Sequence, residues 1–238
     1  RSGLSTGYEV LARWRDPDHG LLLPAAFSGL FTDHRCAERL TRLIAGRAFE
    51  VMSQGPWAAS SACTVALNLT MLDLMNPELV FEFQSLMADA GHVDWSRIVI
   101  EVTESIMLGP RSGQIFRTLQ ELRLRGAKVA LDDFGTGYGG LRHLSGWPVD
   151  ILKVDRHFVS RLGEDLVDGA IVEAIIRIAA GSGLSIIAEG IETREQLRRL
   201  TSMSCERGQG FLFSPAVPRH EIAAASGQID MAALAGGG

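Results

Sequence analysis

The chain has 238 residues, 46% of them hydrophobic, and a formal net charge of −5 at pH 7. This composition suits a single domain with a large core, and the acidic balance argues against binding duplex nucleic acid, which needs a basic face. No apolar run reaches the roughly 18 residues of a membrane-spanning helix. Three widely spaced cysteines form no disulfide or zinc pattern, which favours a reducing compartment such as the cytoplasm.

Short apolar runs alternate with segments of helical periodicity along the chain. The runs predict strands near residues 8–12, 63–68, 97–102, 127–132, 150–154, 185–189 and 209–213. Helical spacing predicts helices over residues 33–52, 77–90, 112–125, 167–181 and 193–203. The alternation favours an α/β fold with a mainly parallel sheet, of the TIM-like (β/α)8 barrel type. One strand of such a barrel is then missing, and it would lie before residue 1 or within residues 19–31.

End signals and domain limits can also be predicted. Gly126 is expected to cap the helix before it, and Thr193 with Gln196 forms a capping-box pattern. The helix over residues 167–181 is expected to bury one apolar face, made of Val167, Ala170, Ile171, Ala174, Ile175 and Ile178. The first residues are polar and lack an initiating Met, so the chain looks cut from something longer. We expect one domain over residues 1–230, and a frayed Ala/Gly-rich tail over residues 231–238.

Polar residues follow the apolar runs at the same end of each predicted strand. They are Glu9, Asn68, Glu101, the pair Asp132 and Asp133, Lys153 and Glu189. This pattern is typical of a parallel barrel with its active site on the rim formed by the carboxyl ends of the strands. Oxygen ligands dominate and neither His nor Cys joins them, so the pattern indicates Mg²⁺ or Mn²⁺ rather than zinc.

The segment from Asp132 to Gly137 is the sharpest local motif. Adjacent residues on a strand point to opposite faces, so Asp132 and Asp133 can both reach a metal only where the backbone turns. Two neighbouring carboxylates repel each other unless cations neutralise them, and a two-metal site would do so. A loop with solvated acids is the alternative interpretation.

Other polar residues near the strand ends have a structural and a functional interpretation. Lys153 among carboxylates could orient a metal-bound water, or it could form a structural pair with Asp155. Arg13 could hold a phosphate oxygen, or it could pair with Glu9. Glu104 and Glu192 could brace the site, or they could be ordinary acids of a first helical turn.

Taken together, these motifs resemble the EAL-domain phosphodiesterases that act on cyclic di-GMP. The resemblance runs from about residue 7 to residue 215. It is carried by Glu9-Val10-Leu11 with Arg13-Trp14, Asn68-Leu69-Thr70, Glu101-Val102-Thr103-Glu104, Asp132-Asp133-Phe134-Gly135-Thr136-Gly137-Tyr138, Leu152-Lys153-Val154-Asp155, Ala188-Glu189-Gly190-Ile191-Glu192 and Gln209-Gly210.

The resemblance implies a barrel with one antiparallel strand that hydrolyses cyclic di-GMP to linear pGpG with two Mg²⁺ or Mn²⁺ ions. It implies a first metal held by Glu9, Asn68, Glu101 and Asp132, and a second held by Asp132, Asp133 and Glu189. Lys153 would orient the attacking water, with Glu189 a candidate proton acceptor. Arg13, Leu11 and Gln209 would bind substrate. Family members often form homodimers and are often fused to regulatory domains, and some are the cytoplasmic part of a membrane-anchored protein.

Supporting roles follow from the same resemblance. Glu104 would anchor the loop from Asp132 to Leu141, while Asp155 and Glu192 would support the metal ligands.

The chain departs from the family pattern in four places. Val10 replaces an Ala, Gly139-Gly140 replaces two serines, Ser28–Asp33 replaces a segment with an Ala-Glu pair, and the first strand with its Gln-Pro motif is absent before Gly7. The loop and the absent strand leave open a receptor that binds cyclic di-GMP without cutting it. A remote alternative is an unrelated barrel lyase or aldolase with Lys153 as a Schiff base.

Overall fold

The computed structural model describes residues 3–54, 63–108, 111–135, 144 and 146–222. The chain divides into two compact units. The N-terminal unit comprises Thr6–Val102 and Gly109–Lys128. The C-terminal unit comprises Arg1–Ser5, Thr103–Leu108 and Val129–Gly238.

The N-terminal unit is built on a parallel sheet. Its strands, in spatial order, are β1 (Gly7–Val10), β4 (Thr64–Asn68) and β5 (Ile98–Thr103). In register, Glu9 lies opposite Ala66, and Asn68 lies opposite Glu101. Nearly every residue of β5 is buried, as expected of a strand covered on both faces.

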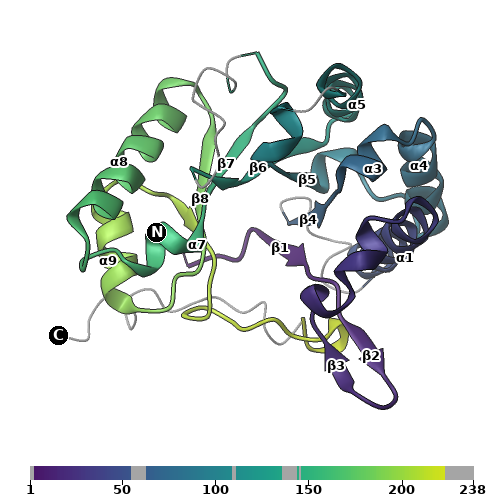
Figure 1. The fold of residues 1–238 in the computed structure, drawn as a ribbon, viewed down its shortest axis with the longest axis horizontal. Helices are drawn as coiled ribbons and strands as arrows, with labels where there is room; N and C mark the ends of the chain where they lie inside the picture. The colour runs from purple at the N-terminus through teal and green to yellow at the C-terminus, as the bar shows by residue number, and fades with distance from the viewer. Residues whose placement is uncertain (1–2, 55–62, 109–110, 136–143, 145, 223–238) are drawn as a thin grey trace. The chain divides into compact units, whose positions relative to one another are not determined.

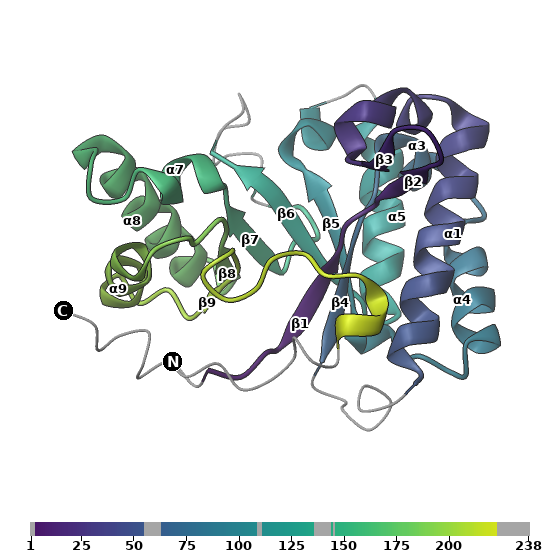
Figure 2. The same cartoon turned by 90° about the horizontal axis from the view of Figure 1, so that it is seen from below.

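Helices cover this sheet. They are α1 (His34–Met52), α3 (Met71–Met75), α4 (Leu79–Asp89) and α5 (Ser112–Leu124), with 3-10 helices η1 (Pro24–Phe31) and η2 (Trp95–Arg97). Figures 1 and 2 show α1 and α4 side by side, where the rings of Phe49 and Phe83 meet edge to face at 5.7 Å. Gly126 has φ 113° just past α5, which confirms the predicted glycine cap.

Residues 19–31 do not supply the missing strand. β3 (Gly20–Leu22) pairs antiparallel with β2 (Trp14–Asp16) in a separate hairpin, and the following residues form η1. Asp16 Oδ1 accepts hydrogen bonds from the backbone N of Asp18 and of His19, which closes the turn. Of the two places considered for the missing strand, residues 19–31 are therefore excluded, because Asp and Gly residues build a local hairpin there instead.

The C-terminal unit repeats the parallel arrangement. Its strands, in spatial order, are β6 (Lys128–Phe134), β7 (Ile151–Val154), β8 (Ser185–Ala188) and β9 (Arg207–Gly208). The helices are α7 (Arg156–Ser160), α8 (Leu166–Gly181) and α9 (Arg194–Ser202), with 3-10 helices η3 (Glu104–Leu108) and η4 (Arg219–Glu221). α8 packs against β7 and β8 (Figure 1), and Thr193 and Gln196 form the predicted capping box of α9. In both units the described pairings of these sheets are parallel, which confirms the mainly parallel α/β fold.

Two predicted details of the C-terminal unit were wrong. The last strand ends at Gly208, and residues 211–213 form a turn rather than a strand. The face that α8 buries contains Asp168, Val172, Ile175, Ile176 and Ala179, whereas Val167 is exposed. Because α8 is apolar on nearly every side, sequence periodicity could not identify its core face. The predicted tail lies outside the described residues, and none of the described helices is both long and apolar enough to cross a membrane.

Candidate active site

Three predicted ligands of the N-terminal unit lie at one edge of its sheet. Asn68 Nδ2 donates a hydrogen bond to Glu9 Oε1 at 2.9 Å, and Asn68 is in register with Glu101. Glu101 is 2% exposed, although it is a carboxylate. The carboxyl ends of parallel strands meet at one edge, which is why residues so far apart in sequence come together. We call Glu9, Asn68 and Glu101 the N-terminal group.

The two predicted substrate contacts of this unit follow β1. Leu11 and Arg13 are both exposed, and Arg13 donates to the backbone O of Ala12 at 2.8 Å. Both side chains are therefore accessible to a ligand, and their contact with substrate stays a prediction.

The C-terminal unit brings a second group together around a buried lysine. Lys153 is 1% exposed, and its Nζ lies 2.6 Å from Glu189 Oε1 and 3.2 Å from Asp132 Oδ2. A buried ammonium group is costly unless it is paired, and these carboxylates compensate it. Such pairing suits a charged group that orients its neighbours rather than the neutral amine that a Schiff base requires.

Gln209 joins the same cluster. Its Nε2 donates to Glu189 Oε1 at 3.1 Å. This contact was not predicted from the sequence, because a strand-end residue carries no signal that tells which neighbouring strand it reaches. We call Asp132, Asp133, Lys153, Glu189 and Gln209 the C-terminal group.

Asp132 and Asp133 lie at the predicted turn of the backbone. Asp133 has φ 55°, its N donates to Asp132 Oδ1 at 3.0 Å, and the register with β7 shifts between Leu131 and Phe134. An aspartate tolerates this left-handed conformation better than most residues. Partial burial of the Asp133 carboxyl, together with the charge of Asp132 and the hydrogen bond to Asp155, raises its pKa to about 6.

The three predicted supporting residues occupy different surroundings. Asp155 accepts a hydrogen bond from the backbone N of His157 at 2.7 Å and so caps α7 beside Asp133. Glu104 begins η3 and is 5% exposed, and its Oε2 has no hydrogen-bond partner within the described part of the chain. Glu192 is exposed just before α9. The loop residues Tyr138 to Leu141, with Gly139 and Gly140, lie outside the described residues.

The donor chemistry of both groups fits a hard divalent cation. Among the described residues, no three His, Cys, Asp or Glu side chains are already arranged as a metal site. The available donors are nevertheless carboxylate and amide oxygens, which Mg²⁺ and Mn²⁺ prefer. Burial first, and then the negative charge of Asp132, raise the pKa of Asp133, and a bound cation would offset both effects.

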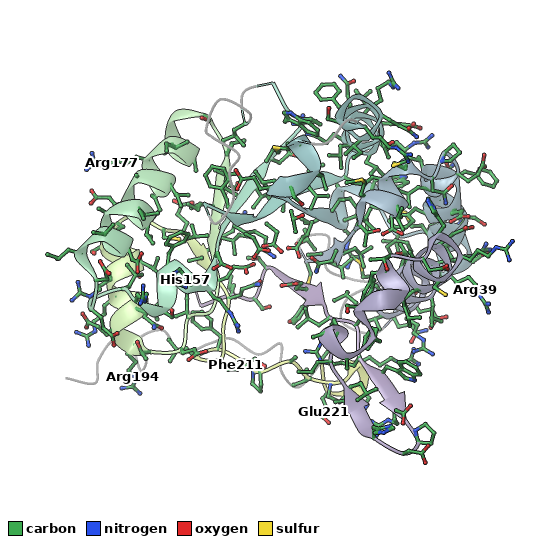
Figure 3. The ribbon with its side chains drawn as sticks, viewed as in Figure 1. Arg39, His157, Arg177, Arg194, Phe211 and Glu221 are labelled. Carbon is green, nitrogen blue, oxygen red and sulfur yellow. The ribbon has the colours of Figure 1, made fainter. Side chains whose placement is uncertain are left out.

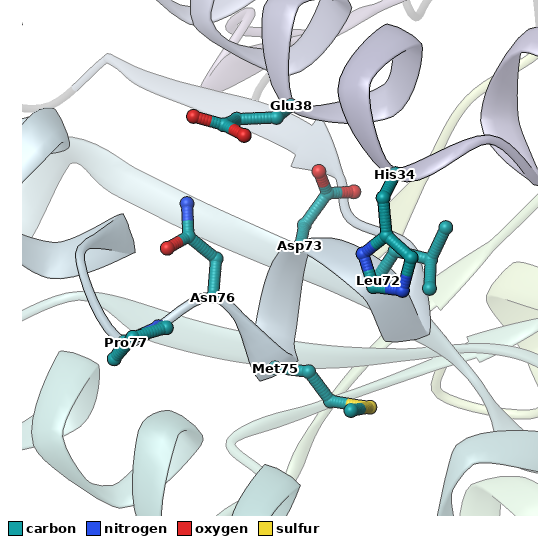
Figure 4. Close-up of a pocket in the computed structure, with 7 residues that line it drawn as sticks. All are labelled: His34, Glu38, Leu72, Asp73, Met75, Asn76 and Pro77. Carbon is teal, nitrogen blue, oxygen red and sulfur yellow. The ribbon is translucent and has the colours of Figure 1, made fainter.

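A separate cavity of about 260 Å³ lies in the N-terminal unit (Figure 4). Its lining residues come from α1, α3 and the turn that follows α3: His34, Glu38, Leu72, Asp73, Met75, Asn76 and Pro77. The buried Asp73 is already used by the cap of α3, because its Oδ2 accepts from the N and Oγ1 of Thr70 at 2.7 and 2.6 Å. The cavity contains no predicted site residue, so it is not the candidate active site.

Comparisons with known proteins give a consistent result. A family model described as the EAL domain matches residues 1–216. The chain is 34% identical to the oxygen sensor protein DosP of Escherichia coli, over 91% of this chain and 27% of DosP. It is 32% identical to the bifunctional diguanylate cyclase/cyclic di-GMP phosphodiesterase MucR of Pseudomonas aeruginosa, over 94% of this chain and 32% of MucR. The chain thus spans less than a third of either relative.

A solved structure agrees with the sequence comparisons. The PaMucR phosphodiesterase in its c-di-GMP complex superposes with a TM-score of 0.84 at 31% identity, covering 91% of this chain and 87% of that chain. This likeness confirms the TIM-like fold that the motifs imply.

Proposed function

Since the chain belongs to the EAL domain family, we propose that it is a metal-dependent phosphodiesterase that hydrolyses cyclic di-GMP to linear pGpG. The family comprises cyclic di-GMP phosphodiesterases and generally depends on divalent metal ions. The observation that carries the proposal is the buried Lys153, held between Asp132 and Glu189. Both of its carboxylate partners lie near the ends of strands of the C-terminal unit and carry oxygen donors of the kind that Mg²⁺ and Mn²⁺ prefer.

The proposal assigns two Mg²⁺ or Mn²⁺ ions to the donors that the sequence singled out. Glu9, Asn68, Glu101 and Asp132 would hold the first, and Asp132, Asp133 and Glu189 the second. Such a pair of cations, when bound, lowers the pKa of bound water and offsets the negative charge of a phosphodiester.

The residues of the chain have distinct tasks in this reaction. Lys153 fixes Glu189 through the 2.6 Å ion pair and contacts Asp132 at 3.2 Å, and its third N–H group can orient the attacking water. Glu189 accepts the proton of that water, and Asp133, which would also hold the second ion, is the second candidate proton acceptor. Arg13 and Leu11 contact the substrate. The water oxygen joins phosphorus while one P–O3′ bond breaks, and the departing 3′ oxygen takes up a proton to give pGpG.

The remaining parts of the proposal concern the whole protein. We infer that the chain is one domain of a longer cytoplasmic protein with regulatory domains, because it spans less than a third of DosP and MucR. We also infer a homodimer from membership in the family. Mass photometry of the purified chain tests the dimer directly.

Incubation with cyclic di-GMP tests the activity. The protein is incubated with Mg²⁺ or Mn²⁺, pGpG is followed by chromatography, and EDTA serves as the metal-free control. Metal-dependent pGpG that is lost in Glu189→Gln supports the proposal, with Glu195→Gln on the exposed surface of α9 as the matched control. Binding of cyclic di-GMP without formation of pGpG would make the chain a receptor. The absence of both binding and product would overturn the assignment.

A further inference from the structure

The contact between Gln209 and Glu189 depends on a close approach of two backbone segments in the C-terminal unit. Gln209 N donates to the O of Ala188 at 2.8 Å, and Ile191 N donates to the O of Gln209 at 3.0 Å. Leu212 N then donates to the O of Ile191 at 2.9 Å. These three hydrogen bonds pair residues 209–212 with residues 188–191 and fix the backbone position of Gln209.

Gly210 lies at the centre of this hydrogen-bonded pairing. A Cβ atom at position 210 would run into the backbone N and O atoms of Ile191, well inside van der Waals contact. Its φ of 153° is also a conformation that residues with side chains rarely adopt. The backbone of Ile191 cannot move aside, because Ile191 is 1% exposed and bonds to both Gln209 and Leu212.

Gly208 provides the contrast two residues earlier. A Cβ atom there would meet the Cδ1 atom of Ile191, which is the far end of a flexible side chain. Phe211, on the other side of Gly210, is 70% exposed (Figure 3), so the core does not hold the segment in place through that side chain. Residue 210 therefore has to be glycine for this hydrogen-bonded pairing to form, whereas a methyl group at residue 208 meets the end of a side chain, which can shift more easily than backbone.

We propose that Gly210 is a positioning residue that sets Gln209 against Glu189, and that Gln209 acts through Glu189 rather than on substrate. The proposal rests on the function proposed above, in which Glu189 holds a metal and accepts a proton. Oε1 of Glu189 contacts both Nζ of Lys153, at 2.6 Å, and Nε2 of Gln209, at 3.1 Å. A ligand oriented by outer partners in this way binds metal more tightly than an unsupported one.

Four variants test the proposal: Gly210→Ala, Gln209→Ala, the double variant, and Gly208→Ala as the matched control. Mn²⁺ affinity is measured by calorimetry without substrate, crystal structures give the Gln209–Glu189 distance, and kcat and KM are measured for cyclic di-GMP. Gly210→Ala and Gln209→Ala should each weaken Mn²⁺ binding by about 10- to 100-fold, the range for loss of an outer partner. The double variant should lose no more, and Gly208→Ala should lose much less than Gly210→Ala.

Several outcomes would overturn the proposal. They are a Gln209–Glu189 contact that survives in Gly210→Ala, losses that multiply in the double variant, or a change in KM with kcat preserved. Should Gly210→Ala fail to fold, unchanged Mn²⁺ affinity in Gln209→Ala would overturn it equally. If wild type binds Mn²⁺ but does not cut cyclic di-GMP, the proposed function fails, while the affinities and crystal distances still decide the role of Gly210.

Discussion

Replacement of Lys153 by methionine is expected to destabilise the metal-free protein. Methionine keeps much of the volume of the side chain but removes the ammonium group between Asp132 and Glu189. Two carboxylates that were compensated then face each other in a partly buried place. The loss of stability should be largest in the absence of metal ions, because no cation then replaces the missing positive charge.

The size of the effect follows from the burial of the three groups. Breaking a buried ion pair by removing one partner costs about 3–5 kcal/mol. The side chains of Asp132 and Glu189 are 13% and 15% exposed, so water weakens part of the repulsion between the two carboxylates. We therefore expect the lower end, about 3 kcal/mol, which lowers the Tm of a chain of this length by about 6–12 °C.

Thermal unfolding followed by circular dichroism in EDTA measures this effect. Lys128→Met is the matched control, because Lys128 is the other lysine of the chain and is exposed at the start of β6. Saturating Mn²⁺ should narrow the gap between Lys153→Met and wild type. A Tm within about 2 °C of wild type in EDTA would refute the reasoning, because it would mean that the carboxylates need no counter-charge.

Three further predictions concern the candidate site residues. Glu9→Ala should abolish turnover and weaken Mn²⁺ binding while the circular dichroism spectrum stays unchanged, because it removes a ligand at the sheet edge rather than core volume; full turnover would contradict this. Lys153→Met should slow turnover at saturating Mn²⁺ without weakening Mn²⁺ binding, and a loss of affinity as large as that of Glu9→Ala would argue against its assignment. Asp133→Asn should raise the Tm of the metal-free protein at pH 7.5. That gain should shrink as the pH falls from about 6 towards 4, because the wild-type carboxyl, with its pKa raised to about 6, then becomes protonated in the folded state; a gain that does not change with pH would contradict the cause.

The ends of the parallel strands were predictable because each combines two signals. An apolar run such as Ile98–Ile100 marks a strand buried on both faces, and the first polar residue after it marks the edge. The placement of Glu9, Asn68, Asp132, Lys153 and Glu189 at strand ends follows from that pattern, whereas the contacts that they make come from the structure. The turn at Asp133 was predictable for a steric reason, since adjacent side chains on a straight strand cannot face the same way.

Features set by tertiary contact were not predictable. Phe211 follows a glycine and looks like part of a strand, yet the backbone of Ile191 diverts the chain at Gly210 and leaves Phe211 exposed. The short helix α3 was missed although its capping box, Thr70 with Asp73, is legible, because five residues are too few for periodicity to detect. The core face of α8 depends on which side of an apolar helix meets β7 and β8.

The burial of Lys153 has a practical consequence for handling this protein. The chain contains two lysines, and in the folded state one is 1% exposed while the other, Lys128, faces water. Amine-reactive dyes and cross-linkers will therefore attach to a single lysine side chain in native molecules and to both in unfolded ones. The mass of the labelled protein then distinguishes folded molecules, with one modified lysine, from unfolded molecules, with two. A fluorophore at Lys128 modifies none of the candidate site residues.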